Sequence, residues 1–156
     1  MTTNSVRWDS LGFPVILVGF RMKTIRGFEV PDVNMNEIQK MAFQALITFP
    51  HRLTGSHTQY LRNYLNETKH EFAKNINVNH DDVLHWEQQG NKATGIDINT
   101  EIVLRFYLFH AFNEPNFRNN PINLNWIKKS KDILTLLTNL DKNDSENSPI
   151  IIERAA

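Results

Sequence analysis

The sequence predicts a mainly α-helical domain with a small N-terminal β-hairpin and two short helices joined by a tight turn at its centre. Apolar residues recur at helical spacing in several stretches between residues 36 and 140. Residues 14–33 are instead rich in β-branched side chains, with Gly27 as a turn signal. The chain has 156 residues, of which 40% are hydrophobic, enough for the core of one domain.

Composition excludes several classes of protein. The chain has no cysteine, so disulfides and thiolate zinc sites are excluded. Its longest apolar run, residues 13–20, is much shorter than the ~20 residues that span a bilayer. No signal-peptide pattern is present, so we expect a cytoplasmic protein with no membrane contact. Seventeen basic and seventeen acidic residues give a formal net charge of zero, whereas DNA-binding domains usually carry a basic excess.

The N-terminal segment, residues 1–50, is predicted to hold the hairpin and one helix. The hairpin would pair "PVILVGFRMKTI" (residues 14–25) with "RGFEVPDV" (residues 26–33), and Pro31 indicates an edge strand or a strand end. The helix would cover residues 36–49, with Asn34 or Asn36 as its cap and Pro50 as its stop.

The central segment, residues 51–95, contains three predicted helices. Thr54 or Ser56 would cap the first. Thr68, followed three residues later by Glu71, forms a capping-box pattern for the second. Residues 77–79 have turn chemistry, because Asn tolerates left-handed backbone angles. Asn79 would then cap the third helix.

The C-terminal segments are predicted to contain two more helices and a tail. Residues 99–112 are apolar nearly all round, so this helix should be buried in the core or in a dimer interface. A Pro- and Asn-rich connection over residues 113–123 leads to a helix over residues 124–140, within the segment 96–140. Either helix could form the dimer interface. The basic cluster "KKSK" (residues 128–131) is interpreted as a solvated face rather than a clamp on a nucleic-acid backbone. Residues 141–156 are predicted to be a polar, flexible tail.

The two short helices of residues 68–89 have the spacing of a helix-turn-helix unit. Ala73 is small enough for the second helix to approach the first closely, and Val78 is the apolar residue of the turn. Val83 and Trp86 would face the preceding helices.

These residues also carry a family resemblance. "LTGSHTQYLRNYLNETKHEFAKNINVNHDDVLHWEQQ" (residues 53–89) resembles the DNA-binding domain of Xre-type regulators, the phage-repressor class, and within it the antitoxin-like branch. The resemblance implies a lambda-repressor-like helix-turn-helix. It also implies a transcriptional regulator that binds double-stranded operator DNA as a homodimer, in one form as an antitoxin that represses its own operon.

The resemblance assigns roles to individual residues. Arg62 and Glu87 match the family's structural ion pair, and breaking one partner of a buried pair costs ~3–5 kcal/mol. The positions that match the family's DNA contacts are Lys69, Asn79, His80, Asp81, His85 and Gln88.

The chain departs from the family pattern at the turn and in the third helix. Asn77 replaces the usual turn glycine and is the next best residue for a positive φ. Asp81 and Asp82 each stabilise a helix N-terminus by ~0.3–1 kcal/mol, because their negative charge interacts favourably with the helix dipole. The same charges repel phosphate. Asp82 is interpreted as helix-start chemistry. For Asp81 both roles are retained, helix-start chemistry and a contact with DNA, because an aspartate can also accept a hydrogen bond from cytosine N4.

A protein-interaction module is therefore the alternative function. In this reading the acidic helix docks a basic partner, such as a ribonuclease-type toxin that the chain neutralises, and DNA binding is weak or lost. No cofactor and no enzymatic activity are predicted, since no phosphate loop, nucleophile elbow or catalytic carboxylate pair is present. The six histidines lack a zinc signature and are interpreted as surface or interface residues.

Overall fold

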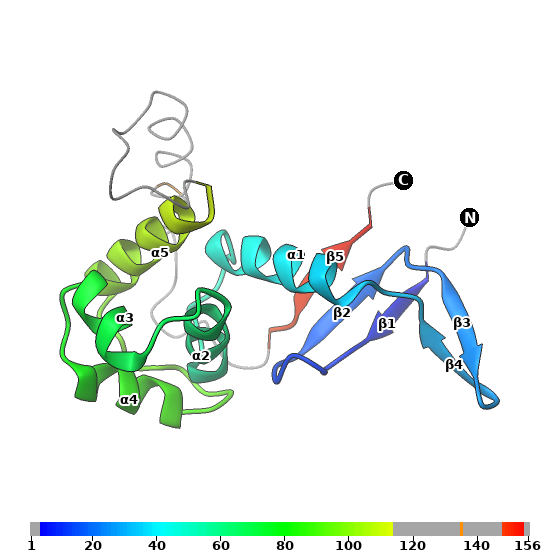
Figure 1. The fold of residues 1–156 in the computed structure, drawn as a ribbon, viewed down its shortest axis with the longest axis horizontal. Coiled ribbons are helices and arrows are strands. Elements are labelled where there is room, and N and C mark those ends of the chain that lie inside the picture. Colours follow the sequence, from blue (N-terminus) through cyan, green and yellow to red (C-terminus); the bar gives the residue numbers. More distant parts are fainter. Residues whose placement is uncertain (1–3, 114–134, 136–147, 155–156) are drawn as a thin grey trace.

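A computed structural model describes residues 4–113, 135 and 148–154 as a mixed α/β domain (Figure 1). Strands lie at one end of the domain, and helices α2, α3, α4 and α5 lie at the other. The strands are β1 (Ser5–Arg7), β2 (Val15–Val18), β3 (Met22–Ile25), β4 (Phe28–Pro31) and β5 (Ile150–Glu153). The helices are α1 (Met35–Ile47), α2 (Gly55–Tyr64), α3 (Lys69–Asn75), α4 (His80–Gln88) and α5 (Ile98–Asn113).

A three-stranded sheet in the order β1-β2-β5 corrects the prediction for the tail. β5 comes from the segment 141–156, which was expected to be polar and flexible, and it pairs in parallel with β2 from Val15↔Ile150 to Val18↔Glu153. The physical reason is burial: Ile150 and Ile152 alternate with exposed residues and are almost fully buried. The end of this tail is therefore part of the core.

The predicted hairpin exists, but only between β3 and β4. These strands pair antiparallel with Ile25 opposite Phe28. Arg26 and Gly27 make the turn with φ values of 50° and 82°, the left-handed angles that a two-residue hairpin turn uses. The expectation that the whole of residues 14–25 belongs to this hairpin is wrong, because β2 pairs with β1 and β5 instead. The hairpin extends away from the helices (Figure 1).

Helix α1 covers one face of the three-stranded sheet. Of the two predicted caps, Asn34 is the one used: its side chain accepts hydrogen bonds from the amides of Asn36 and Glu37 at 3.0 and 3.3 Å. The buried face of α1 includes Ile38, Phe43 and Leu46, which belong to one continuous core with the sheet and the other helices.

Helix α5 is largely buried, as its apolar sequence predicts. Leu104 and Leu108 are fully buried, whereas Val103 is about half exposed. None of the helices within the described ranges is long and apolar enough to cross a membrane. The predicted helix over residues 124–140, its basic cluster at residues 128–131 and the connection after residue 113 lie outside the described residues, except for residue 135.

Candidate nucleic-acid interface

Helix α2 begins at a tight packing point against the end of α4. Of the two predicted caps, Thr54 is used, and its hydroxyl accepts a hydrogen bond from the amide of His57 at 3.2 Å. Gly55 follows, and a Cβ at this position would lie 2.3 Å from the backbone oxygen of Trp86. Only glycine lets the two helices approach this closely, so Gly55 fixes how α2 meets α4.

The two connections between α2, α3 and α4 use the same cap. Asn66 after α2 and Asn77 after α3 have φ values of 58° and 59°. After α3, the amide of Asn77 donates to the carbonyl of Lys74 at 3.3 Å, and the amide of Val78 donates to that of Ala73 at 2.9 Å. This pair of bonds is a Schellman cap, which ends a helix at a left-handed residue. The prediction that Asn77 has a positive φ is confirmed.

Helix α3 begins as the sequence predicts. The hydroxyl of Thr68 accepts a hydrogen bond from the amide of Glu71 at 3.1 Å. Lys69 is the first residue of the helix and is partly exposed, while Phe72 and Ala73 are buried. Helices α3 and α4 pack against each other, with Val83 also buried in the same core.

Arg62 and Glu87 form the predicted ion pair. The guanidinium contacts the carboxylate through two nitrogens, with Nη2–Oε1 at 2.8 Å and Nε–Oε2 at 3.1 Å. Both side chains are mostly buried, at 11% and 5% exposure. Arg62 also donates to the backbone oxygen of Glu67 at 2.8 Å. One side chain therefore joins α2, α4 and the connection before α3.

The two aspartates of α4 have different environments. The carboxylate of Asp82 accepts a hydrogen bond from the backbone amide of Asn79 at 3.2 Å, so it caps the start of its own helix, as predicted. The side chain of Asp81 is 95% exposed, and its Oδ1 lies 3.4 Å from Nδ1 of His80. Only Asp81 is therefore turned fully toward solvent.

The predicted DNA-contact residues lie at the surface of α3 and α4. Asp81, His85 and Gln88 are exposed and spaced i, i+4, i+7, which places them on one helix face. The buried residues Val83 and Trp86 lie on the other side of the helix. Asn79 is exposed just before the helix, while His80 and Lys69 are partly exposed.

His80 packs against a residue that the sequence did not single out. Its ring stacks on that of His70 in α3, with ring centroids 4.0 Å apart and an interplanar angle of 17°. The two histidines are ten positions apart in sequence and lie on different helices, so no local spacing rule could have predicted the contact.

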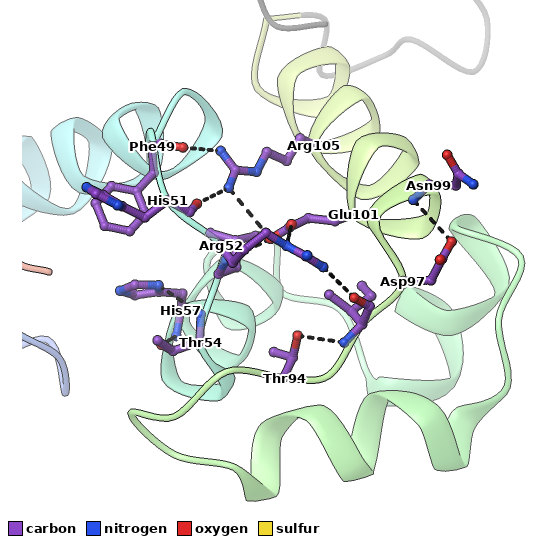
Figure 2. Close-up of polar contacts among 12 residues, drawn as sticks. Phe49, His51, Arg52, Thr54, His57, Thr94, Asp97, Asn99, Glu101 and Arg105 are labelled. Carbon is purple, nitrogen blue, oxygen red and sulfur yellow. Dashed lines mark hydrogen bonds and ion pairs between the residues drawn. The ribbon is translucent and has the colours of Figure 1, made fainter. Parts of the chain in front are cut away.

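A buried polar cluster joins α5 to the segment between α1 and α2 (Figure 2). The carboxylate of Glu101 pairs with Arg52 and lies 3.6 Å from Arg105, and it accepts the amide of Leu53 at 2.7 Å. Arg105 also donates to the backbone oxygens of Phe49 and His51. The cluster's three charged side chains are at most 9% exposed. Sequence reasoning missed this cluster, although a Glu–Arg pair at i, i+4 inside an apolar helix signals buried charges that need partners.

The arrangement of this cluster favours a structural role. The arginine donors are directed to backbone oxygens and to the Glu101 carboxylate, and none of the three charged side chains carries a hydroxyl or thiol nucleophile. A cavity of about 300 Å³ lies beside it, lined by Arg52, Leu53 and residues 93–98. Over the described part of the chain, no group of three or more metal-ligating side chains comes together.

Burial shifts the pKa of three groups in or beside the core. His57 was expected to be a surface or interface residue but is buried between the rings of Phe13 and Phe49. Its Nδ1 accepts a hydrogen bond from the amide of Thr54 at 3.1 Å, which completes the α2 cap and satisfies the buried ring. Burial, with a smaller effect of the nearby Arg105 charge, lowers the pKa of His57 to about 3. Burial also lowers the pKa of Arg105 to about 10, although Glu101 opposes the shift. Burial raises the pKa of Tyr60, whose hydroxyl donates to the backbone oxygen of Gln39.

Comparison with known proteins finds no match to this chain among family models, curated proteins or solved structures. The geometry of α2, α3 and α4 is therefore the basis on which a function can be assigned to the chain.

Proposed function

We propose that the chain is a cytoplasmic DNA-binding transcriptional regulator of the Xre helix-turn-helix class, with α2, α3 and α4 arranged as in the lambda repressor. It would bind operator DNA as a homodimer. The observation that carries the proposal is the exposed face of α4, where Asp81, His85 and Gln88 project opposite the buried side of the helix. A recognition helix needs such a row of polar side chains to reach base edges in the major groove.

The acidity of α4 is less unfavourable for DNA than the sequence suggests. Asp82 is engaged with the backbone amide of Asn79, so its charge serves the helix start. Asp81 lies beside His80, with Oδ1 of the carboxylate 3.4 Å from Nδ1 of the imidazole. A single exposed carboxylate can read cytosine N4, which supports Asp81 as a base-contacting residue.

Phosphate contacts would come from the start of α3. Lys69 is the first residue of that helix and is partly exposed, in the position that the family uses for a backbone contact. Arg62 would not contribute, because its guanidinium is engaged by Glu87 and Glu67. Asn79, His80 and the exposed face of α4 would complete the interface.

The test is binding of the purified chain to DNA from immediately upstream of its own gene, with scrambled DNA of equal composition as the competitor. At two salt concentrations, we expect specific binding that weakens steeply with salt. Lys69→Ala should weaken binding to both DNAs and reduce the salt slope by about 0.9 for each protomer, or about 1.8 for the dimer. Lys23→Ala, on the distant hairpin, is the matched control and should change neither. A folded protein that binds neither DNA at low salt would overturn the proposal.

The alternative, a module that binds a basic protein such as a toxin, is favoured by one observation: the full exposure of Asp81. It predicts a stoichiometric complex with the product of the adjacent gene that Asp81→Asn weakens. The DNA reading makes a different prediction for the same variant, since a loss of specificity at one base pair would mark Asp81 as a base reader.

A further inference from the structure

In the part of the chain that the structure describes, strand β5 forms one edge of the three-stranded sheet. It has β2 on one side, and no described strand lies on the other. On the β2 side, the amides of Ile150 and Arg154 donate to Pro14 and Val18 at 3.1 and 3.0 Å. Successive residues of a strand direct their backbone groups to alternate sides, so those of Ile151 and Glu153 are directed away from β2. These groups form a short row of donors and acceptors at the edge.

The strand itself protects this edge only through its short length and the charge of Glu153. Sheet edges are usually blocked by a lysine, a proline, a bulge or a covering segment. The strand reads "IIIE", and its pairing with β2 continues through all four residues without a bulge. The side chain of Ile151 is 63% exposed, on the sheet face opposite the buried Ile150 and Ile152. An edge of this kind binds another extended strand.

The edge is complementary to itself. In an antiparallel pair centred on Ile152, Ile151 of one copy lies opposite Glu153 of the second copy, and the reverse. Both residues then exchange backbone hydrogen bonds through the groups that β2 does not use. A register centred on Glu153 would place two carboxylates opposite each other. One centred on Ile151 would bring Pro149, which has no N–H, into the ladder.

Charge is compatible with association between copies. Because the whole chain has a formal net charge of zero, two copies experience no overall repulsion. In the register centred on Ile152, the two Glu153 side chains are also offset diagonally, each beside an isoleucine.

We infer that two copies of this chain associate through antiparallel pairing of their β5 strands, which makes one continuous sheet in the order β1-β2-β5-β5-β2-β1. Such an interface is isologous and closes with two copies. This interface would supply the dimer of the proposed function, although the observations behind it concern the edge of β5 alone. Each strand contributes only four residues, so the association should be weak and concentration-dependent.

Sedimentation equilibrium of the full chain, over a wide concentration range and without DNA, tests the inference. Ile151→Pro removes an N–H on the open side together with the exposed isoleucine side chain, and it leaves the backbone groups that pair with β2 in place. Ile151→Lys keeps every backbone group and adds a charge at the edge. Phe28→Ala is the control, because it removes an apolar side chain that is 73% exposed on the distant hairpin.

We expect the unaltered chain and Phe28→Ala to form dimers with the same dissociation constant. Both Ile151 variants should weaken the dimer about tenfold or more without changing the helical circular dichroism signal. A chain that stays monomeric at the highest concentration would overturn the inference, as would an Ile151→Lys variant that associates like the unaltered chain. If Ile151→Pro does not fold, the dissociation constant of Ile151→Lys alone tests whether the dimer forms through β5. Because DNA is absent, failure here is separate from failure of the proposed function.

Discussion

Replacing His57 with glutamine should remove part of the protein's sensitivity to acid. The imidazole is buried, and its Nδ1 accepts a hydrogen bond from the amide of Thr54, so the folded state requires the neutral ring. Protonation would place an N–H against another N–H at the start of α2. The His57→Gln variant would keep an oxygen that can accept from Thr54, and its side-chain amide would have no charge to gain.

The sign and size of this change in stability with pH follow from the linkage between proton binding and folding. The pKa of His57 is lowered to about 3 in the folded protein, against about 6.5 for an unperturbed histidine. Above about pH 6.5 neither state is protonated. Between these values the unfolded state binds one more proton, so the free energy of unfolding falls by about 1.4 kcal/mol per pH unit as the pH falls. Over the whole window the loss would be roughly 5 kcal/mol.

Urea unfolding followed by circular dichroism at about pH 7, 6 and 5 measures this effect. Other groups also titrate, so the informative quantity is the difference in pH slope between the unaltered chain and His57→Gln. We expect the unaltered chain to lose stability more steeply below about pH 6.5. Equal slopes would show that His57 is accessible to protons in the folded state, and the argument from burial would then be wrong.

Two further substitutions test the geometry of the helical unit. Gly55→Ala should destabilise the fold by about 1–3 kcal/mol, because the new Cβ would lie 2.3 Å from the backbone oxygen of Trp86. The control is Gln59→Ala, on the exposed side of α2, which should cost little. Thermal unfolding compares the two variants, and equal melting temperatures would contradict the packing argument. Arg62→Met should cost about 3–5 kcal/mol in urea unfolding by leaving Glu87 buried without its partner, and a loss below about 1 kcal/mol would show that the pair is effectively solvated.

Local signals in the sequence predicted the helical part of the fold well. The caps at Asn34, Thr54 and Thr68 are used, and Asn77 has the expected positive φ. The contact between Arg62 and Glu87 came from the family resemblance, since no local rule links residues 25 positions apart. Each cap depends on a few neighbouring residues, which is why the sequence alone was sufficient for them.

Long-range pairing is the part that the sequence could not supply. Ile150–Glu153 is too short to stand out from a polar segment, and its partner β2 lies more than 130 residues earlier in the chain. The buried charges Glu101 and Arg105 were likewise hidden inside an apolar helix. In the candidate interface, the six residues predicted to contact DNA come from the resemblance, whereas the partners of Asp82 and His80 depend on three-dimensional contacts.

The parallel pairing of β2 with β5 also sets an order for folding during synthesis. Helix α4 contacts α2 and α3, and α1 contacts α2 and α5, so these contacts can form while the rest of the chain is still being translated. The sheet cannot be completed until residues 150–153 have left the ribosome. Until then Val15 and Leu17 lack the isoleucines that lie beside them in the folded protein. The nascent chain therefore passes through a stage with formed helices and an exposed apolar strand, when it is most open to chaperones and to aggregation.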